Sequence, residues 1–399
     1  MDRQGLTRWR SAEQTRARFQ RKDGRWVGSL NLGWENGKRK RRHFYAATAA
    51  EVRGELLKAR SDQSHGLPVS VERQTVKEFL DHWLAESVKS SVRPATYQQY
   101  HQHVRLYLGP WLGRHQLSQL SPQHVQTFVN ERLKSDLSPR TVQLSLVILR
   151  HALQTGVKWG LVGRNVAKLV DTPKVRRPEI KPLDLEQSRK FLDAAKGERL
   201  EALYSVALGL GLREGEALGL HWIDLDLERQ LIIIRQSLQR VGGKRFGTGP
   251  GQLQFVEPKT ERSRRTLRIP DALVRSLRAH RARQLQERLI ASSGWIERGL
   301  VFTTGIGTPI EPRSAVRDFK RILEKANLPE SAAKIPLSTR FHDLRHSAAS
   351  LLLAQGVQLR AIMELLGHST IALTANTYSH VMPSMMQDMA DKMGTILNS

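Results

Sequence analysis

The stretch over residues 342–378 constrains the fold of this 399-residue chain more than any other part of the sequence. It begins HDLRHSAASLLLAQG, where small and apolar residues favour a helix from about residue 347 and Gly356 is placed to end it. A second short helix is predicted over 358–366, and Gly367 ends that helix in the same way. The stretch is therefore expected to form two consecutive short helices whose ends carry polar side chains.

Four of these polar residues are candidates for one site. His342 and Arg345 are three positions apart, a spacing that places both on one face of a helix. His368 follows the second helix, and Tyr378 comes ten residues later. Each residue alone is more often a packed or solvated side chain than a catalytic one. A functional interpretation therefore needs partners elsewhere in the chain.

Two upstream motifs supply such partners. GLREGE at 211–216 contains Arg213, and EPKT at 257–260 contains Lys259. The ordered set of Arg, Lys, His, Arg, His and Tyr resembles the catalytic constellation of the tyrosine recombinases, the phage-integrase family. The resemblance rests on four segments between about 180 and 385, which read GLREGEALGLHWIDLD, EPKTERSRRTLRIP, HDLRHSAASLLLAQG and LGHSTIALTANTYSH.

The composition agrees with a protein that acts on DNA. A net charge of +26 and a pI near 10.9 favour a polyanion as partner. The chain has no cysteine, which excludes disulfides, thiolate metal sites and a cysteine nucleophile. No apolar run reaches the length of a membrane span, and residues 1–30 lack a signal-peptide core. We expect a cytoplasmic protein of a bacterial host cell with no membrane partner.

Residues 1–65 are predicted to form an N-terminal domain after a flexible arm. The turn signals Asp23-Gly24 and Asn36-Gly37 separate three strands at about 16–22, 25–34 and 38–45. Alternation places Trp26, Leu30, Leu32 and Trp34 on one face of the middle strand. Thr48 and Glu51 form a capping box that starts a helix reaching about residue 60.

The basic run KRKRR at 38–42 has two interpretations. It could read DNA from a small sheet, or it could protect an edge strand with charge. The similarity to the arm-binding domains of integrative recombinases favours DNA. The candidate DNA-contact residues here are Arg25, Lys38, Arg39, Lys40, Arg41 and Arg42.

Two further domains are predicted. Residues 66–177 read as all-helical from about residue 75, with helix starts at Thr75, Pro94, Pro122 and Pro139, and they resemble the SAM-like core-binding domain of the family. A proline-rich linker at 171–182 carries the further DNA-contact candidates Lys174, Arg176 and Arg177. Residues 178–399 are predicted to be a mixed, mainly helical α+β catalytic domain with strands at 231–235, 252–258 and 264–270. The whole chain is thus expected to be multidomain and mainly α.

The resemblance implies a role for each site residue. Two arginines would clamp the scissile phosphate, and a tyrosine would attack it and form a covalent 3′-phosphotyrosine. One histidine would act as base, the other would bind a phosphate oxygen, and the lysine would protonate the 5′-hydroxyl leaving group. Because the cations are side chains, neither a metal nor another cofactor is expected. The roles fall on Arg213 and Arg345 as clamps, Tyr378 as nucleophile, His342 as base, His368 as phosphate ligand, Lys259 as acid and Glu216 as the residue that orients the pocket.

The expected function is site-specific recombination that integrates or excises a phage genome or mobile element. The implied partner is double-stranded DNA at core and arm sites, on which the chain would assemble as a homotetramer. A directionality factor or a host bending factor is a further possible partner. Two alternatives are a DNA-binding regulator on an inactive recombinase fold and a type IB topoisomerase-like enzyme. The complete set of six residues disfavours the first, and the extra N-terminal domain disfavours the second. A Met-rich helix at 382–397 could pack within its own subunit or on a neighbour.

Overall fold

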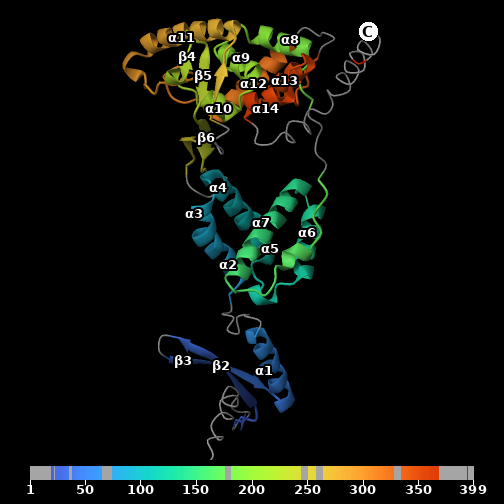
Figure 1. Cartoon of the computed structure of the whole chain (residues 1–399). Coiled ribbons are helices and arrows are strands. Elements are labelled where there is room, and N and C mark those ends of the chain that lie inside the picture. Colours follow the sequence, from blue (N-terminus) through green and yellow to red (C-terminus); the bar gives the residue numbers. More distant parts are fainter. Residues whose placement is uncertain are drawn as a thin grey trace, which may run out of the picture. The chain divides into compact units, whose positions relative to one another are not determined.

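The computed structural model describes residues 19–21, 23–35, 38–64, 74–135, 137–175, 181–243, 250–257, 264–327, 334–367 and 393. The chain divides into two compact units near residue 176. Figure 1 shows the described elements, which are mainly helical with small sheets, as the sequence predicts. The predicted helix at 382–397 lies outside the described residues except for Met393.

The N-terminal part contains a three-stranded antiparallel sheet in the order β1-β2-β3 and one helix. The capping box starts this helix as expected, because the backbone N–H of Glu51 donates to Oγ1 of Thr48 and the backbone N–H of Thr48 donates to the Glu51 carboxylate. The elements are β1 Phe19–Gln20, β2 Trp26–Glu35, β3 Lys38–Ala46 and α1 Ala49–Ser64.

Helix α1 covers one face of this sheet. Leu30 and Phe44 of the sheet share a small buried core with residues of the helix. Gly28 lies on the same face, where a Cβ would come within 2.5 Å of the Leu56 side chain. Glycine at position 28 therefore allows the helix to approach the sheet closely.

A β-bulge corrects one expectation about β2. The register shifts between Asn31 and Gly33, so that Trp34 pairs with Arg39 instead of continuing the earlier alternation. This extra residue places Trp34 on the face away from α1, and its side chain is 75% exposed. The prediction that Trp34 shares a face with Trp26 and Leu30 is wrong, because sequence alternation alone does not reveal a bulge.

A helical part follows, with its own core around Phe79, Trp83 and Phe128. Thr75, Ser121 and Ser138 accept hydrogen bonds from the backbone three residues later, and proline occupies the first helical turn after Ser121 and Ser138. The helices are α2 Val76–Trp83, α3 Lys89–Ser91, α4 Pro94–His103, α5 Gly109–Leu112, α6 Pro122–Lys134 and α7 Pro139–Lys158, with π-helical segments at Leu84–Val88 and Val104–Leu108.

The chain that leaves this core is held by Arg150 of α7. Its guanidinium donates to the carbonyl oxygens of Ala167 (2.9 Å) and Val170 (2.7 Å) and to Oγ1 of Thr172 (2.9 Å). On the other side of the linker, the backbone N–H of Leu183 donates to the buried Oγ of Ser347 (2.8 Å). The linker is therefore fixed at both of its described ends.

The C-terminal unit packs helices around a three-stranded sheet in the order β4-β5-β8, with a separate β6-β7 hairpin. The three predicted strands are present as β5, β7 and β8, whereas β4 and β6 were not predicted. Helix α13 begins at Asp343, four residues before the predicted start. The elements are α8 Leu185–Ala195, α9 Glu201–Gly209, α10 Glu214–Leu218, β4 Leu225–Asp226, β5 Leu231–Ile234, β6 Ser237–Val241, β7 Gln252–Val256, β8 Arg265–Arg268, α11 Asp271–Ala291, α12 Pro312–Ala326, α13 Asp343–Ala354 and α14 Leu359–Leu366.

Candidate active site

The motif at 211–216 begins with a glycine in a left-handed backbone conformation. Gly211 has φ of +60°, and a Cβ there would lie 2.6 Å from Cδ2 of Leu366 and 3.5 Å from Cβ of Ala348. The absence of a side chain therefore lets the α9–α10 connection lie against α13 and α14. Arg213 follows at the N-cap of α10, just before the first helical residue.

Glu216 joins Arg213 to a second arginine. Nη1 of Arg213 donates to Oε1 of Glu216 (2.6 Å), and Nη2 of Arg265 donates to Oε2 (3.0 Å). Burial by itself would raise the pKa of Glu216, but the charges of Arg265, Arg213 and Arg345 outweigh it and hold that pKa below its usual value. Glu216 is thus an ionised, buried carboxylate that binds the Arg213 guanidinium.

Arg345 lies inside the domain, with only 1% of its surface exposed. Its Nη1 donates to the carbonyl oxygen of Gly211 (2.8 Å), and its Nη2 donates to the carbonyl oxygen of Leu366. These bonds fix the plane of the guanidinium between the first motif and the end of α14.

His342 lies at the N-cap of α13 and keeps an exposed surface. Partial burial, followed by the positive charges of Arg345 and Arg213, lowers its pKa. His346, one helical turn later, places its ring 5.1 Å from that of His342 at an angle of 87°. Burial, with a contribution from His342, lowers the pKa of His346 to about 4. Both rings are therefore neutral near pH 7.

The structure thus brings together Arg213, His342, Arg345 and Glu216 from the predicted set. Lys259, His368 and Tyr378 lie outside the described residues. Arg265 is a site residue that sequence reasoning missed, although it stands in the RSRRTLRIP segment that carries the resemblance. The sequence predicts a strand at this position, but the inward direction of the Arg265 side chain follows only from the pairing of β8 with β5.

The predicted DNA-contact residues that the structure describes belong to the first of the two units. Arg25 is exposed and paired with Asp23 at 2.9 Å, Arg41 is exposed, and Arg42 lies over the ring of Phe44 at 5.0 Å. Lys174 is exposed. Only the backbone of Lys38, Arg39 and Lys40 is described, as part of β3, and Arg176 and Arg177 lie outside the described residues.

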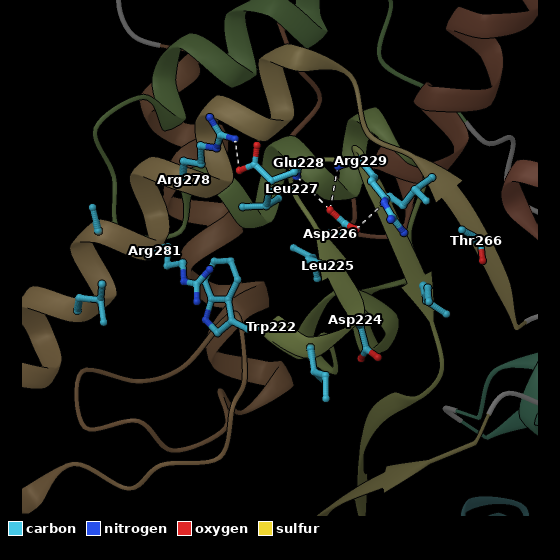
Figure 2. A pocket seen from close by; sticks show the side chains of 15 residues that line it. Trp222, Asp224, Leu225, Asp226, Leu227, Glu228, Arg229, Thr266, Arg278 and Arg281 are labelled. Atoms are coloured by element: carbon cyan, nitrogen blue, oxygen red, sulfur yellow. Dashed lines mark hydrogen bonds and ion pairs between the residues drawn. The ribbon is translucent and has the colours of Figure 1, made fainter.

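A pocket of about 820 Å³ lies elsewhere on the C-terminal unit. Figure 2 shows it between α11 and the outer face of the small sheet, with Arg281 over the Trp222 ring. Leu231, Ile233 and Thr266 line this outer face. The lining of this pocket includes none of the candidate catalytic residues that the structure describes.

Two features are absent from the described part of the chain. Its helices include none that is both long and apolar enough to cross a membrane. Its His, Asp and Glu side chains form no group of three or more that could hold a metal ion.

Comparison with known proteins identifies the family. Residues 181–385 match the model of the phage integrase family, and residues 75–133 match that of the phage integrase N-terminal SAM-like domain. A tyrosine recombinase XerC-like protein of Caldanaerobacter subterraneus subsp. tengcongensis is 33% identical over 88% of this chain and 90% of its own. An integrase of Saccharopolyspora erythraea is 29% identical over 94% of each chain.

The fold agrees with this assignment. A structure of the Tn1549 transposon integrase in complex with a circular intermediate DNA matches with a TM-score of 0.64 and 21% identity, over 79% of this chain and 99% of that one. A lambda integrase tetramer bound to a Holliday junction matches with a TM-score of 0.55 and 15% identity, over 90% and 94%. The chain belongs to the phage integrase family and is a tyrosine recombinase, a site-specific enzyme that cleaves and rejoins DNA strands.

Proposed function

We propose that Arg213, Arg345 and His342 form the phosphate-binding half of the active centre, and that Lys259, His368 and Tyr378 complete it. The observation that carries this proposal is the convergence of three motifs on one place. Segment 211–216, the start of α13 and the end of α14 are joined by Arg345, which donates to Gly211 and Leu366. His368 is the second residue after Leu366 in the sequence, and this proximity in sequence supports the proposal that it belongs to the same site.

The chemistry follows from the charges of these groups. Guanidinium groups stabilise the charge that develops on a phosphate under attack, because their planar donors can contact two oxygens at once. His342 with a lowered pKa is neutral near pH 7 and able to accept the proton of Tyr378 as the phenol attacks. Lys259 would then donate a proton to the departing 5′-hydroxyl. The covalent phosphotyrosine preserves the bond energy for rejoining.

We further propose that the enzyme works as a homotetramer on double-stranded DNA, with three functional parts. Residues 1–65 would bind arm sites, 66–177 would bind the core site, and 178–399 would carry out the reaction. Support comes from the net charge of +26, from the match of residues 75–133 to a SAM-like domain, and from the DNA-bound tetramer of a structural neighbour. A directionality factor or a bending factor is a further candidate partner.

The test uses a core-site DNA that traps the covalent product because the cleaved end diffuses away. The wild-type chain should form a protein–DNA adduct that resists denaturation. Tyr378→Phe should bind the same DNA with similar affinity and form no adduct, because only the attacking oxygen is lost. An adduct with Tyr378→Phe would show that another residue is the nucleophile. Absence of any adduct with the wild-type chain would favour a DNA-binding regulator.

The arginine roles are tested on the same substrate. Arg213→Ala and Arg345→Ala should each reduce the cleavage rate by about 10²–10³-fold, as expected when a donor to the transition state is removed. Glu216 contacts Arg213, so Glu216→Gln should reduce cleavage less than Arg213→Ala does. A change of only a few-fold in either arginine variant would remove that residue from the phosphate-binding set.

A further inference from the structure

Arg265 is directed into the catalytic unit by the alternation of β8. It pairs with the buried Ile234 of β5, whereas the next residue, Thr266, pairs with Ile233 and lines the outer pocket of Figure 2. The Arg265 side chain is consequently only 7% exposed. A buried guanidinium requires compensating partners, since an isolated charge in the interior is costly.

The partners of Arg265 come from two different catalytic motifs. Its Nη2 donates to Glu216 at 3.0 Å, and its Nε donates to the carbonyl oxygen of Leu365 at 2.7 Å. Arg345 joins the same two regions, because it donates to the carbonyl oxygens of Gly211 and Leu366. Two buried arginines therefore link the segment of Arg213 to two adjacent carbonyl groups at the C-terminus of α14.

The end of α14 is the last described part of the chain before His368 and Tyr378 in the sequence. Gly367 adopts a left-handed conformation with φ of 62°, and His368 is the next residue. A guanidinium bound to the Leu365 carbonyl fixes the last turn of α14 directly before this point. The same guanidinium fixes the carboxylate that holds Arg213.

We propose that Arg265 is a positioning residue for DNA strand cleavage, which acts through Glu216 on Arg213 and through the Leu365 carbonyl on the chain leading to His368. This inference rests on the proposed function. Arg265 needs no contact with DNA in this role. Its removal misplaces the groups that do contact the phosphate, and misplacement by about 1 Å can reduce a rate by about 10²-fold.

Because Glu216 is ionisable, this positioning role should produce a characteristic pH dependence of the cleavage rate. The charged groups that act on this buried carboxylate are Arg265 of β8, Arg213 at the cap of α10 and Arg345 of α13, and Arg265 has the largest influence of the three. Without Arg265, only Arg213 and Arg345 oppose the effect of burial, so we expect the pKa of Glu216 to rise. Protonation of this carboxyl would remove its ionic bond with Arg213, and a higher pH would restore that bond.

The experiment measures single-turnover cleavage of the trapping substrate from pH 6 to 9. Arg265→Gln should be slower than wild type by about 10²-fold at low pH, and the deficit should shrink as the pH rises. Arg265→Lys keeps the charge and should have a smaller deficit that varies less with pH. Arg268→Gln is the matched control, because Arg268 is on the same strand but exposed, and it should cleave like wild type.

Two further variants separate positioning from a loss of folding. Glu216→Gln combined with Arg265→Gln should show no recovery at high pH, because no carboxylate remains to ionise. Melting temperatures and DNA affinities report whether each variant is folded. Wild-type rates in Arg265→Gln, or a deficit that is equal at every pH, would overturn the inference. An adduct with Tyr378→Phe would instead contradict the proposed function, so the two failures are distinguishable.

Discussion

His342 and His346 are two histidines of one helix with different exposure. His342 keeps an accessible edge at the start of α13, whereas His346 lies one turn further in, and both have lowered pKa values. The accessible ring is suited to take a proton from a nucleophile. The inner ring supports it by edge-to-face contact and stays neutral, which avoids a second positive charge beside His342.

The pH dependence of the protein's stability should show the effect of protonating His346. Its pKa of about 4 lies below the value of about 6.5 expected in an unfolded chain. The unfolded state therefore binds the proton more tightly, and the stabilising contribution is complete above pH 6.5 and is lost as the pH falls toward 4. His346→Phe keeps a ring at the site without this proton. Its melting temperature should fall less steeply between pH 6.5 and 4 than that of wild type, and an equally steep fall would contradict the assignment.

Lys259 is tested by changing the leaving group. If Lys259 protonates the 5′-oxygen, Lys259→Ala should cleave a substrate with a bridging 5′-phosphorothiolate at close to the wild-type rate, because a thiolate leaves without an acid. On ordinary DNA the same variant should be slow. Arg213→Ala serves as the control and should stay slow on both substrates. Equal defects of Lys259→Ala on both substrates would make Lys259 a binding residue.

Short helices carry the described residues of the candidate site, and the ends of these helices depend on glycines and on capping residues. Gly211 brings the loop before α10 against α14, and Gly356 and Gly367 end α13 and α14 in left-handed conformations. The sequence predicts the helix ends at Gly356 and Gly367 well, because terminal glycines are local signals, but it does not reveal the close approach at Gly211. Strand β4 is only two residues long, and the bulge in β2 depends on pairing with β3, so neither can be predicted from the residues alone.

Strand pairing, which the sequence does not reveal, also separates the site residues that can be predicted from the one that cannot. Arg213, His342 and Arg345 stand in motifs whose spacing is visible in the sequence. Arg265 stands among four arginines between 262 and 268, and only the register of β8 against β5 shows which of them points inward. The inward direction of Arg265 is therefore known only from the pairing of two strands that are distant in sequence.

Gly211→Ala tests the close approach of these elements. The new Cβ would lie 2.6 Å from the Leu366 side chain, at a backbone φ of +60° that disfavours alanine. We expect a lower melting temperature, and a cleavage rate reduced more than DNA affinity, because the end of α14 moves with respect to Arg213. Gly197→Ala is the matched control, since Gly197 also has a positive φ but no atom within 4 Å of its Cβ. Equal cleavage by the two variants would contradict this reading of Gly211.

At the scale of the whole molecule, the candidate catalytic residues all follow the linker, whereas the basic strand β3 precedes the helical part. A chain lacking residues 1–65 should therefore still cleave an isolated core site. It should fail to integrate DNA that carries both core and arm sites, because bridging depends on two linked binding modules. Integration is measured by sequencing the recombinant junctions. Efficient integration by the truncated chain would leave the charges of β3 with a protective role at the sheet edge.

The two anchors of the linker determine how far the units can separate. From Thr172, held by Arg150, to Leu183, held by Ser347, there are about 11 residue steps, which span at most about 40 Å when fully extended. If each unit binds DNA as proposed, a unit that releases its contacts stays within this distance of the other unit, at a high local concentration. We then expect rebinding to be faster than escape, so that the enzyme leaves its substrate only when both units release DNA together.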